Sequence, residues 1–293
     1  MEKLIPKPRW IKMRPPSGDS YTKVKRSLRS LDLHTVCEEA KCPNISECWG
    51  MGTATIMVMG DVCSRACRFC AVNRGRPALL DNEEPERVAK AISEWGELTY
   101  VVITSVCRDD LQDGGAEHIA KTIGAIKALC PKIIVESLIP DFKGKEDSIK
   151  EVISARPEVI SHNIETVSRL SSRVRDARAS YDQSLQVLEK INRYQIDPRI
   201  YTKSSIMIGL GETDEEIIQT MADLRSAGVS ILTIGQYLQP TSRHLPVVEY
   251  VAPEKFNWLR EIAMQMGFLY VAAGPLVRSS NKAGESYMKI KLL

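Results

Sequence analysis

The sequence predicts an α/β protein built on a partial (β/α)6 TIM-type barrel with an extension at each end. Between about residues 53 and 250, short apolar runs alternate six times with segments of helical periodicity. Parallel strands need such crossover connections, so this alternation indicates a parallel sheet. The length of 293 residues suffices for one large α/β domain. Six units are fewer than a full barrel has.

The first part of the chain, residues 1–52, is expected to be an extension in front of the barrel. It opens with a proline-punctuated arm, and Val24, Leu28 and Leu31 then recur at helical spacing. The charged residues around this apolar seam include Lys23, Lys25, Arg26 and Arg29. Such a helix is either a solvated basic face or a docking surface for an acidic partner.

The barrel is expected over residues 53–250, with the functional loops at the carboxyl ends of its strands. The expected strands are residues 54–60, 99–106, 132–139, 158–164, 199–209 and 229–238. Helical patterns lie between them at 85–97, 116–130, 145–155, 181–194 and 214–228. The last part, 251–293, is expected to be a second extension, with a helix at 253–267, a short strand at 268–274 and a polar tail.

Composition and charge argue against several classes of protein. The net charge of +3 is too small to indicate nucleic-acid binding by itself. No apolar run approaches the length of a membrane span, and the first residues lack the apolar core of a secretory signal. We therefore expect a cytoplasmic protein that binds neither nucleic acid nor a membrane.

The cysteines are too clustered for a disulfide protein. Six of the eight lie between residues 37 and 70. A reducing cytosol disfavours disulfides, and such clustering is typical of metal binding. Cys107 and Cys130 stand apart, and we expect both to be buried small side chains.

Cys63, Cys67 and Cys70 follow the first expected strand at spacings x3 and x2. A structural zinc site needs four ligands, and no fourth cysteine or histidine follows nearby. The spacing also differs from that of a bacterial ferredoxin. Three thiolates on a cubane iron–sulfur cluster would leave one iron open to a small chelating molecule.

This Cys-x3-Cys-x2-Cys run, with Phe69 before its last cysteine, resembles the signature of the radical S-adenosylmethionine superfamily. The resemblance implies that the amino and carboxylate groups of S-adenosylmethionine chelate the open iron. It also implies that an electron from the cluster cleaves the sulfonium and releases a 5′-deoxyadenosyl radical.

A second set, Cys37, Cys42 and Cys48, lies ahead of the first at spacings x4 and x5. Alone, its Cys42–Pro43 pair would also fit a ferredoxin fragment. Placed before the first set, it resembles the auxiliary triplet of the lipoyl synthase family. The resemblance covers nearly the whole chain, through the segments PKPRWIKMRPP, VVITSVCRDDLQDGGAEH, LIPDFKG, SHNIETV, MIGLGET, IGQYLQP and AGPLVRSS.

This resemblance implies two [4Fe–4S] clusters, with Ser279 in the tail as fourth ligand of the auxiliary one and as a catalytic residue. Serine oxygen is a harder and weaker iron ligand than thiolate, so that corner should release most easily. Asn281 stands where the family has tyrosine. Cys107 stands where it has an acid or amide, and we expect it not to be a ligand.

Polar and glycine residues at the expected strand ends are candidates for binding S-adenosylmethionine. Gly114 and Gly115 resemble the superfamily's glycine pair, although a plain turn explains them equally well. The other candidates are Asn163 and Glu165 for the ribose or amino group, and Gly209 and Glu212 for the adenosine pocket. His162 is expected to be structural.

The resemblance implies insertion of two sulfur atoms, at C6 and C8 of an octanoyl group on a protein lysine, with the auxiliary cluster as sulfur donor. The carrier would be an oxo-acid dehydrogenase acyltransferase subunit or the glycine cleavage H protein. A reductant such as ferredoxin or flavodoxin is implied as well. The alternatives are another sulfur-inserting or methylthio-transferring radical enzyme, and a two-cluster electron carrier.

Overall fold

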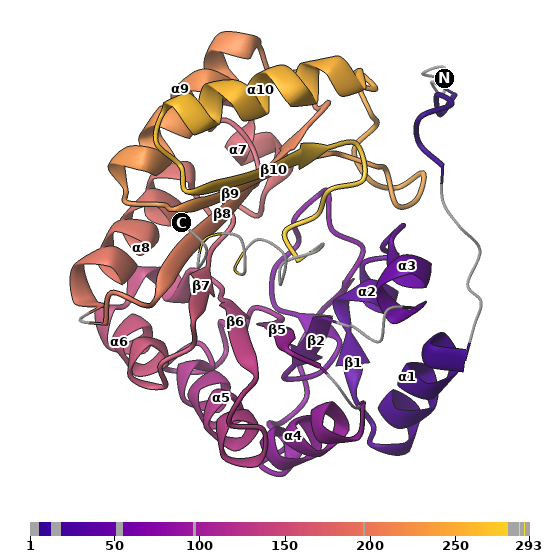
Figure 1. The fold of residues 1–293 in the computed structure, drawn as a ribbon, viewed down its shortest axis with the longest axis vertical. Helices are drawn as coiled ribbons and strands as arrows, with labels where there is room; N and C mark the ends of the chain where they lie inside the picture. Colours follow the sequence, from indigo (N-terminus) through magenta and orange to yellow (C-terminus); the bar gives the residue numbers. More distant parts are fainter. Residues whose placement is uncertain are drawn as a thin grey trace.

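The computed structural model describes residues 6–12, 19–50, 55–95, 98–195, 197–280, 287 and 290. Its main feature is a curled eight-stranded sheet with helices around its outside (Figure 1). The strand order is β1-β2-β5-β6-β7-β8-β9-β10, and all neighbours are parallel except β1 and β2. The edge strands β1 and β10 do not pair with each other, so the sheet is a partial barrel.

The six expected strands are all present and neighbour one another in chain order. They are β2 (Thr55–Val58), β5 (Tyr100–Ser105), β6 (Ile134–Leu138), β7 (Val159–Ser161), β8 (Tyr201–Ile208) and β9 (Ile231–Gln236). The short strand expected near the end of the chain is β10 (Tyr270–Gly274), which extends the sheet beside β9. The sequence did not predict β1 (His34–Thr35), because two residues are too few to show an alternating pattern.

Helices connect the strands as the periodicity predicts. The outer helices are α4 (Glu84–Glu94), α5 (Ala116–Leu129), α6 (Glu146–Ser154), α8 (Tyr181–Tyr194), α9 (Asp214–Ser226) and α10 (Pro253–Gln265). Their starts follow known signals: Ser180 caps α8, Thr213 and Glu216 form a capping box on α9, and proline lies in the first turn of α4 and α10. Shorter elements are η1 (Phe142–Gly144) and α7 (Ser168–Val174).

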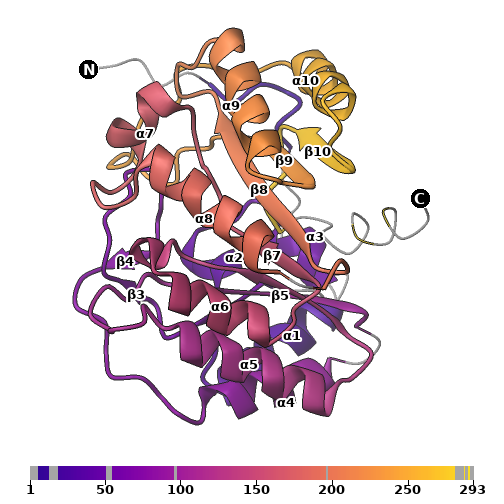
Figure 2. The same cartoon turned by 90° about the vertical axis from the view of Figure 1, so that its left-hand side faces the viewer.

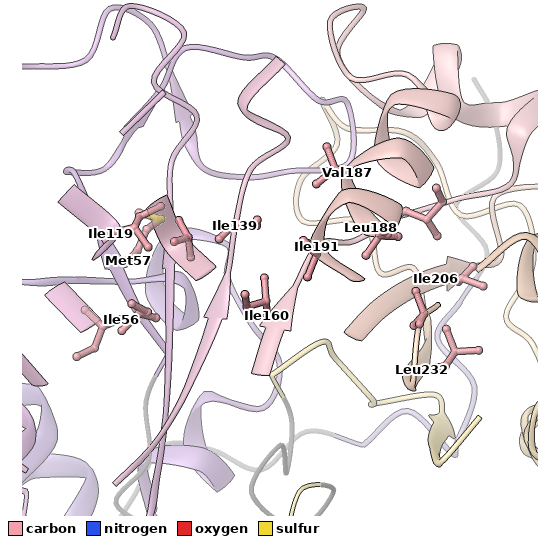
Figure 3. Close-up of a cluster of buried hydrophobic side chains, with 14 of the residues drawn as sticks. Ile56, Met57, Ile119, Ile139, Ile160, Val187, Leu188, Ile191, Ile206 and Leu232 are labelled. Carbon is pink, nitrogen blue, oxygen red and sulfur yellow. The ribbon is translucent and has the colours of Figure 1, made fainter. Parts of the chain in front are cut away.

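The apolar core lies between the sheet and this outer ring of helices. Figure 3 shows part of it, with Ile160 and Ile206 from the strands near Leu188 and Ile191 of α8. All four side chains are fully buried. Each strand therefore presents one apolar face to the helices, which is what sets its register.

The opposite face of the central strands carries a buried ion pair. Lys203 Nζ lies 2.9 Å from each oxygen of the Glu136 carboxylate, which also accepts hydrogen bonds from Tyr100 and Ser161. Buried charges are tolerated when they are paired and fully hydrogen-bonded, as here. Among the described residues, none of the helices has the length and apolar character needed to cross a lipid bilayer.

Three helices precede the barrel: α1 (Asp19–Ser30), α2 (Val36–Glu39) and α3 (Ile45–Gly50). The seam of α1 is buried at Val24 and Leu28, and Tyr21 packs its ring on Trp49 of α3, with centroids 4.9 Å apart. Figure 1 shows α2 and α3 at the open side of the curled sheet, between β1 and β10. The segment expected to be a separate extension therefore sits on the opening of the barrel.

Candidate active site

The first cysteine triplet lies on a long loop at the carboxyl end of β2, residues 60–76, called here the cysteine loop. The turn into it uses left-handed backbone at Met59 (φ 69°) and Gly60 (φ 85°). Two short strands, β3 (Val62–Cys63) and β4 (Asn73–Arg74), pair within the loop and hold its two ends together. The sequence correctly placed this triplet after the first barrel strand.

Backbone amides point at two of the three sulfur atoms. Cys63 Sγ accepts the N–H of Arg65 at 3.4 Å and of Cys107 at 3.3 Å, and Cys67 Sγ accepts that of Asp176 at 3.3 Å. Burial raises the pKa of Cys70 to about 12, and repulsion from the Cys67 and Cys63 thiolates adds to that rise. The mutual effect on pKa shows that the three thiols lie near one another, and the N–H groups that donate to sulfur stabilise the thiolate form, which is the form that binds iron.

Cys107 lies beside this triplet, at the end of β5. A hydrogen bond from the Cys107 thiol is the main reason that the pKa of Cys63 is lowered to about 6. Cys107 also lines a small cleft next to the loop, together with Arg65, Arg108 and Phe142 among other residues. Cys107 thus contacts Cys63, which is a predicted cluster ligand. That Cys107 is not a ligand itself stays a prediction.

Arg65, in the middle of the cysteine loop, is buried between two carboxylates. Its guanidinium donates to Asp109 at 2.9 Å and to Asp141 at 2.6 and 2.7 Å. The exposed fractions of the three side chains are only 4%, 11% and 1%. Bidentate pairs of this kind fix position as well as charge, so the loop is bound rigidly to the ends of β5 and β6.

Later segments of the chain hold the other side of the cysteine loop. The Ala66 N–H donates to Asp176 at 2.8 Å, and the Arg68 N–H donates to the carbonyl of Val174 at 2.9 Å. After β9, His244 Nε2 lies 3.0 Å from the carbonyl oxygen of Cys70. Hydrogen bonds therefore connect the cysteine loop to segments that follow several barrel strands. Sequence reasoning missed these anchors, because each is an ordinary polar residue far from the cysteines along the chain.

Asn163 and Glu165, predicted to bind S-adenosylmethionine, follow β7 and lie close to the triplet. Asn163 Nδ2 donates to Glu165 at 3.1 Å, and the buried Asn163 Oδ1 has no hydrogen-bond partner among the described residues. Glu165 is held in left-handed backbone (φ 70°). Burial is the main cause that raises the pKa of Cys67 and Cys70, and the Glu165 carboxylate nearby adds a smaller rise. A buried acceptor without a donor beside the thiols fits an amino or hydroxyl group of a cofactor.

The structure gives the predicted glycine pair a packing role. Gly115 has φ 88°, and a Cβ atom there would lie 2.3 Å from Met59 Sδ, while one at Gly114 would lie 3.0 Å from a ring carbon of Phe142. Asp113 accepts the N–H groups of Gly115 and Glu117 at the start of α5. The turn reading therefore explains both glycines, and their contact with a cofactor stays a prediction.

The loop after β8 is likewise closed on itself. Glu212 accepts the N–H groups of Gly209 and Leu210. Gly209 has φ 100°, and a Cβ atom there would collide with Gln236 and the carbonyl of Glu249. Contact of Gly209 and Glu212 with adenosine stays a prediction.

His162 has the structural role that the sequence suggested. Its two ring nitrogens lie 3.0 Å from the Ile139 carbonyl and 2.9 Å from Ser184 Oγ, between the sheet and α8. Burial lowers its pKa to about 4.

In the second triplet, Cys37 lies on α2, Cys48 on α3 and Cys42 in the connection between them. Burial raises the pKa of Cys37 to about 12, and repulsion from Cys42 and Cys48 contributes. The same Cys37 sulfur accepts a backbone hydrogen bond from Thr55, the first residue of β2. The second triplet therefore lies near the start of β2, and the first triplet follows the end of the same strand.

Asn44, between Cys42 and Cys48, binds the tail of the chain. Its Nδ2 donates to the Leu276 carbonyl at 2.7 Å, and the side chain is buried. This bond brings Arg278 next to Cys42. Burial raises the pKa of the Cys42 thiol, and the Asn44 N–H and then the Arg278 guanidinium partly oppose that rise. Ser279 follows directly, half-buried. Asn281 lies outside the described residues.

Another contact keeps the tail close to the barrel. A Cβ atom on Gly235 of β9 would lie 2.2 Å from the Val277 carbonyl oxygen, so only glycine allows this approach. Within the described residues, no three His, Cys, Asp or Glu side chains share the geometry of a single metal ion.

Comparisons with known proteins agree with this geometry. The family model for the radical SAM superfamily matches residues 57–224, and that for the N-terminal domain of lipoyl synthase matches residues 2–42. The mitochondrial lipoyl synthase of Rattus norvegicus is 55% identical over 288 residues, which cover 96% of this chain and 76% of that protein. The lipoyl synthase of Halobacterium salinarum is 56% identical over 287 residues, covering 96% and 91%. This chain belongs to the lipoyl synthase family.

Solved structures confirm the fold at much lower identity. The maturase HydG superposes with a TM-score of 0.57 at 14% identity, covering 93% of this chain and 67% of that one. Methylornithine synthase superposes with a TM-score of 0.53 at 10% identity, covering 93% and 87%. As a lipoyl synthase, the chain is a sulfur-inserting enzyme that uses S-adenosylmethionine and a [4Fe–4S] cluster.

Proposed function

We propose that this lipoyl synthase inserts sulfur at C6 and C8 of an octanoyl group on a lysine of a carrier protein, and that a second, auxiliary [4Fe–4S] cluster supplies both sulfur atoms. The observation that carries the proposal is the placement of two thiol triplets around β2, one of them held through Asn44 to Leu276 in the tail segment that also carries Ser279. An electron carrier would need neither a barrel nor a tail that contacts the second triplet, as Leu276 does by bonding Asn44, which lies 232 residues earlier in the chain.

Cys63, Cys67 and Cys70 would hold the cluster that binds S-adenosylmethionine. When bound, this pair supplies the one-electron chemistry that removes hydrogen from unactivated carbon, which no side chain is basic enough to deprotonate. The chain's own residues keep the cofactor in place: Asn163 offers an unpaired acceptor, Glu165 a carboxylate, and Arg65 fixes the loop. Gly114, Gly115, Gly209 and Glu212 would complete the pocket.

Cys37, Cys42, Cys48 and Ser279 would hold the auxiliary cluster. Thiolates bind iron strongly, whereas the serine oxygen is a weaker ligand, so that corner opens first. The half-buried position of Ser279, one residue after Arg278, whose guanidinium acts on the Cys42 thiol, supports this role. Opening one corner is what a cluster needs in order to give up sulfide.

The proposal also covers organisation and partners. Residues 1–52 carry the auxiliary cysteines, 53–250 form the radical SAM barrel, and 251–293 carry the serine ligand. The carrier is an octanoylated acyltransferase subunit of an oxo-acid dehydrogenase or a glycine cleavage H protein, and ferredoxin or flavodoxin is the reductant. No nucleic acid takes part.

Isotopic labelling of the cluster sulfide tests the sulfur donor. Both sulfur atoms of one product should carry the label, and turnover should stall near one product per enzyme. Ser279→Cys should retain the auxiliary cluster and release sulfur more slowly, because thiolate binds iron more tightly. Ser280→Cys, one residue further, is the matched control and should behave like the unmodified enzyme. Unlabelled product over many turnovers, with the cluster intact, would disprove the proposal.

A further inference from the structure

A group of exposed arginines borders the cysteine loop. It consists of Arg68, Arg74, Arg76, Arg173 and Arg243, called here the arginine rim. Hydrogen bonds to backbone carbonyls bring its three segments together. Arg68 donates from its side chain to the Arg173 carbonyl at 3.5 Å, and the N–H of Leu245 donates to the Arg68 carbonyl at 3.3 Å. Arg74 lies on β4, paired with β3 in the same loop.

None of these five guanidinium groups has a carboxylate within ion-pair distance in the described part of the chain. The arginines that do form such pairs are Arg29, Arg65, Arg87, Arg108, Arg169, Arg178 and Arg199. Other described arginines, such as Arg26 and Arg193, also lie outside ion-pair distance of a carboxylate, so what distinguishes the rim is that five such arginines border one loop of a chain whose net charge is only +3. Unpaired cations gathered on one edge create a local positive field that attracts acidic surfaces.

The position of the rim decides what it can meet. It lies at the carboxyl ends of the barrel strands, around the loop that carries Cys63, Cys67 and Cys70. An octanoyl chain attached to a protein lysine must reach this site as a side-chain arm. The body of the carrier protein therefore has to rest on the rim while the arm enters.

We propose that the arginine rim is the docking surface for an acidic face of the carrier protein, the face that surrounds its octanoylated lysine. The inference rests on the proposed function, and it names the chemistry of the partner surface. Complementary charge would speed encounter and align the arm with the site.

The basic helix α1 is the rival surface, and the structure disfavours it. Figure 2 shows β3 and β4 at one side of the molecule and α1 toward the other. On α1, Arg29 pairs with Glu38 at 2.7 Å, whereas the other basic residues of the helix have no carboxylate within ion-pair distance in the described part of the chain, so position rather than charge separates the two surfaces. A carrier bound to α1 would hold its lysine away from the cysteine loop.

Two triple variants with the same change of charge separate the surfaces. The rim variant is Arg74→Glu/Arg173→Glu/Arg243→Glu, which leaves Arg68 intact because it lies between two cysteines. The control is Lys23→Glu/Lys25→Glu/Arg26→Glu on α1. The probe is an octanoylated lipoyl domain, titrated calorimetrically into each reconstituted enzyme at low and high salt. We expect the rim variant to weaken binding about tenfold or more at low salt, with a smaller loss at high salt, and the control to change it less than about twofold.

A second probe is the same lipoyl domain with the carboxylates flanking its lysine changed to amides. Charge complementarity predicts that rim reversal costs this domain little. Unchanged affinity of the rim variant for the acidic domain, or a loss confined to the α1 variant, would overturn the inference. A short neutral octanoyl-lysine peptide serves as a separate check. If no enzyme form adds sulfur to this peptide or to the carrier, the proposed function is wrong. The binding measurement still tests separately whether the arginine rim is the docking surface.

Discussion

The two thiol triplets of this lipoyl synthase are held by the fold in different ways. The cysteine loop is bound to the barrel rim by a buried arginine between two carboxylates and by contacts that reach Asp176 and His244. The auxiliary triplet lies on two short helices and the connection between them, and the side-chain amide of Asn44 and the guanidinium of Arg278 link it to the tail that carries Ser279. The first arrangement suits a site that must keep its geometry through every turnover. The second suits a site that must open.

Removing each triplet in turn gives the largest expected effect. The reconstituted enzyme should contain about eight irons, four for each cluster. Cys63→Ala/Cys67→Ala/Cys70→Ala should halve the iron and abolish cleavage of S-adenosylmethionine. The corresponding triple variant at Cys37, Cys42 and Cys48 should also lose half the iron yet still cleave S-adenosylmethionine, without forming a sulfur product. Iron analysis and detection of 5′-deoxyadenosine measure both, and full iron in either variant would refute the assignment of that triplet.

Replacing Arg65 tests whether the cysteine loop depends on its buried charge. Arg65→Met leaves Asp109 and Asp141 without their cation, and breaking a buried pair costs about 3–5 kcal/mol in the free energy of unfolding. Arg65→Lys keeps the charge but loses the bidentate geometry, so its loss should be smaller. Denaturant unfolding of the cluster-free protein gives the stability, and electron paramagnetic resonance of the reduced enzyme reports on the first cluster. Equal stability of the two variants would contradict the role of the charge.

Asn44→Ala should loosen the auxiliary site alone. The Leu276 carbonyl would lose its donor, which costs about 1–3 kcal/mol if it stays buried. We expect the auxiliary cluster to be lost faster on dilution or chelation, with cleavage of S-adenosylmethionine unchanged. Asn73→Ala, an exposed amide in the cysteine loop that bonds Asp61 at 3.3 Å, is the control. Faster loss of iron from both variants alike would argue against a specific role of Asn44.

Arg29→Ala should have the smallest effect and sharpens the contrast with Arg65. Its ion pair with Glu38 is 2.7 Å long, but the arginine side chain is 60% exposed. Exposed pairs contribute about 0.2–1 kcal/mol, and salt screens them. Thermal unfolding at two ionic strengths measures this, and a loss as large as that of Arg65→Met would show that exposure does not separate the two arginines.

The strands and helices of the barrel could be predicted because each has a clear periodic pattern. Runs such as residues 99–106 and 229–238 are apolar and short, and the helices between them repeat every three to four residues. The strand β1 could not be predicted, because two residues are too few to show a pattern and their strand conformation depends on pairing with β2. The cysteine triplets were predictable because ligand spacing is a local property of the chain.

The predicted ligands, their spacing and the order of the elements thus follow from the sequence alone, since each depends on residues that are close along the chain. The tertiary structure decided which distant residues serve those ligands. The contacts of Arg65 with Asp109 and Asp141, and of Asn44 with Leu276, exist because the fold places these distant segments side by side. The physical reason is that a hydrogen bond or ion pair depends on distance in space. Separations of 44, 76 and 232 residues leave no trace in a local pattern.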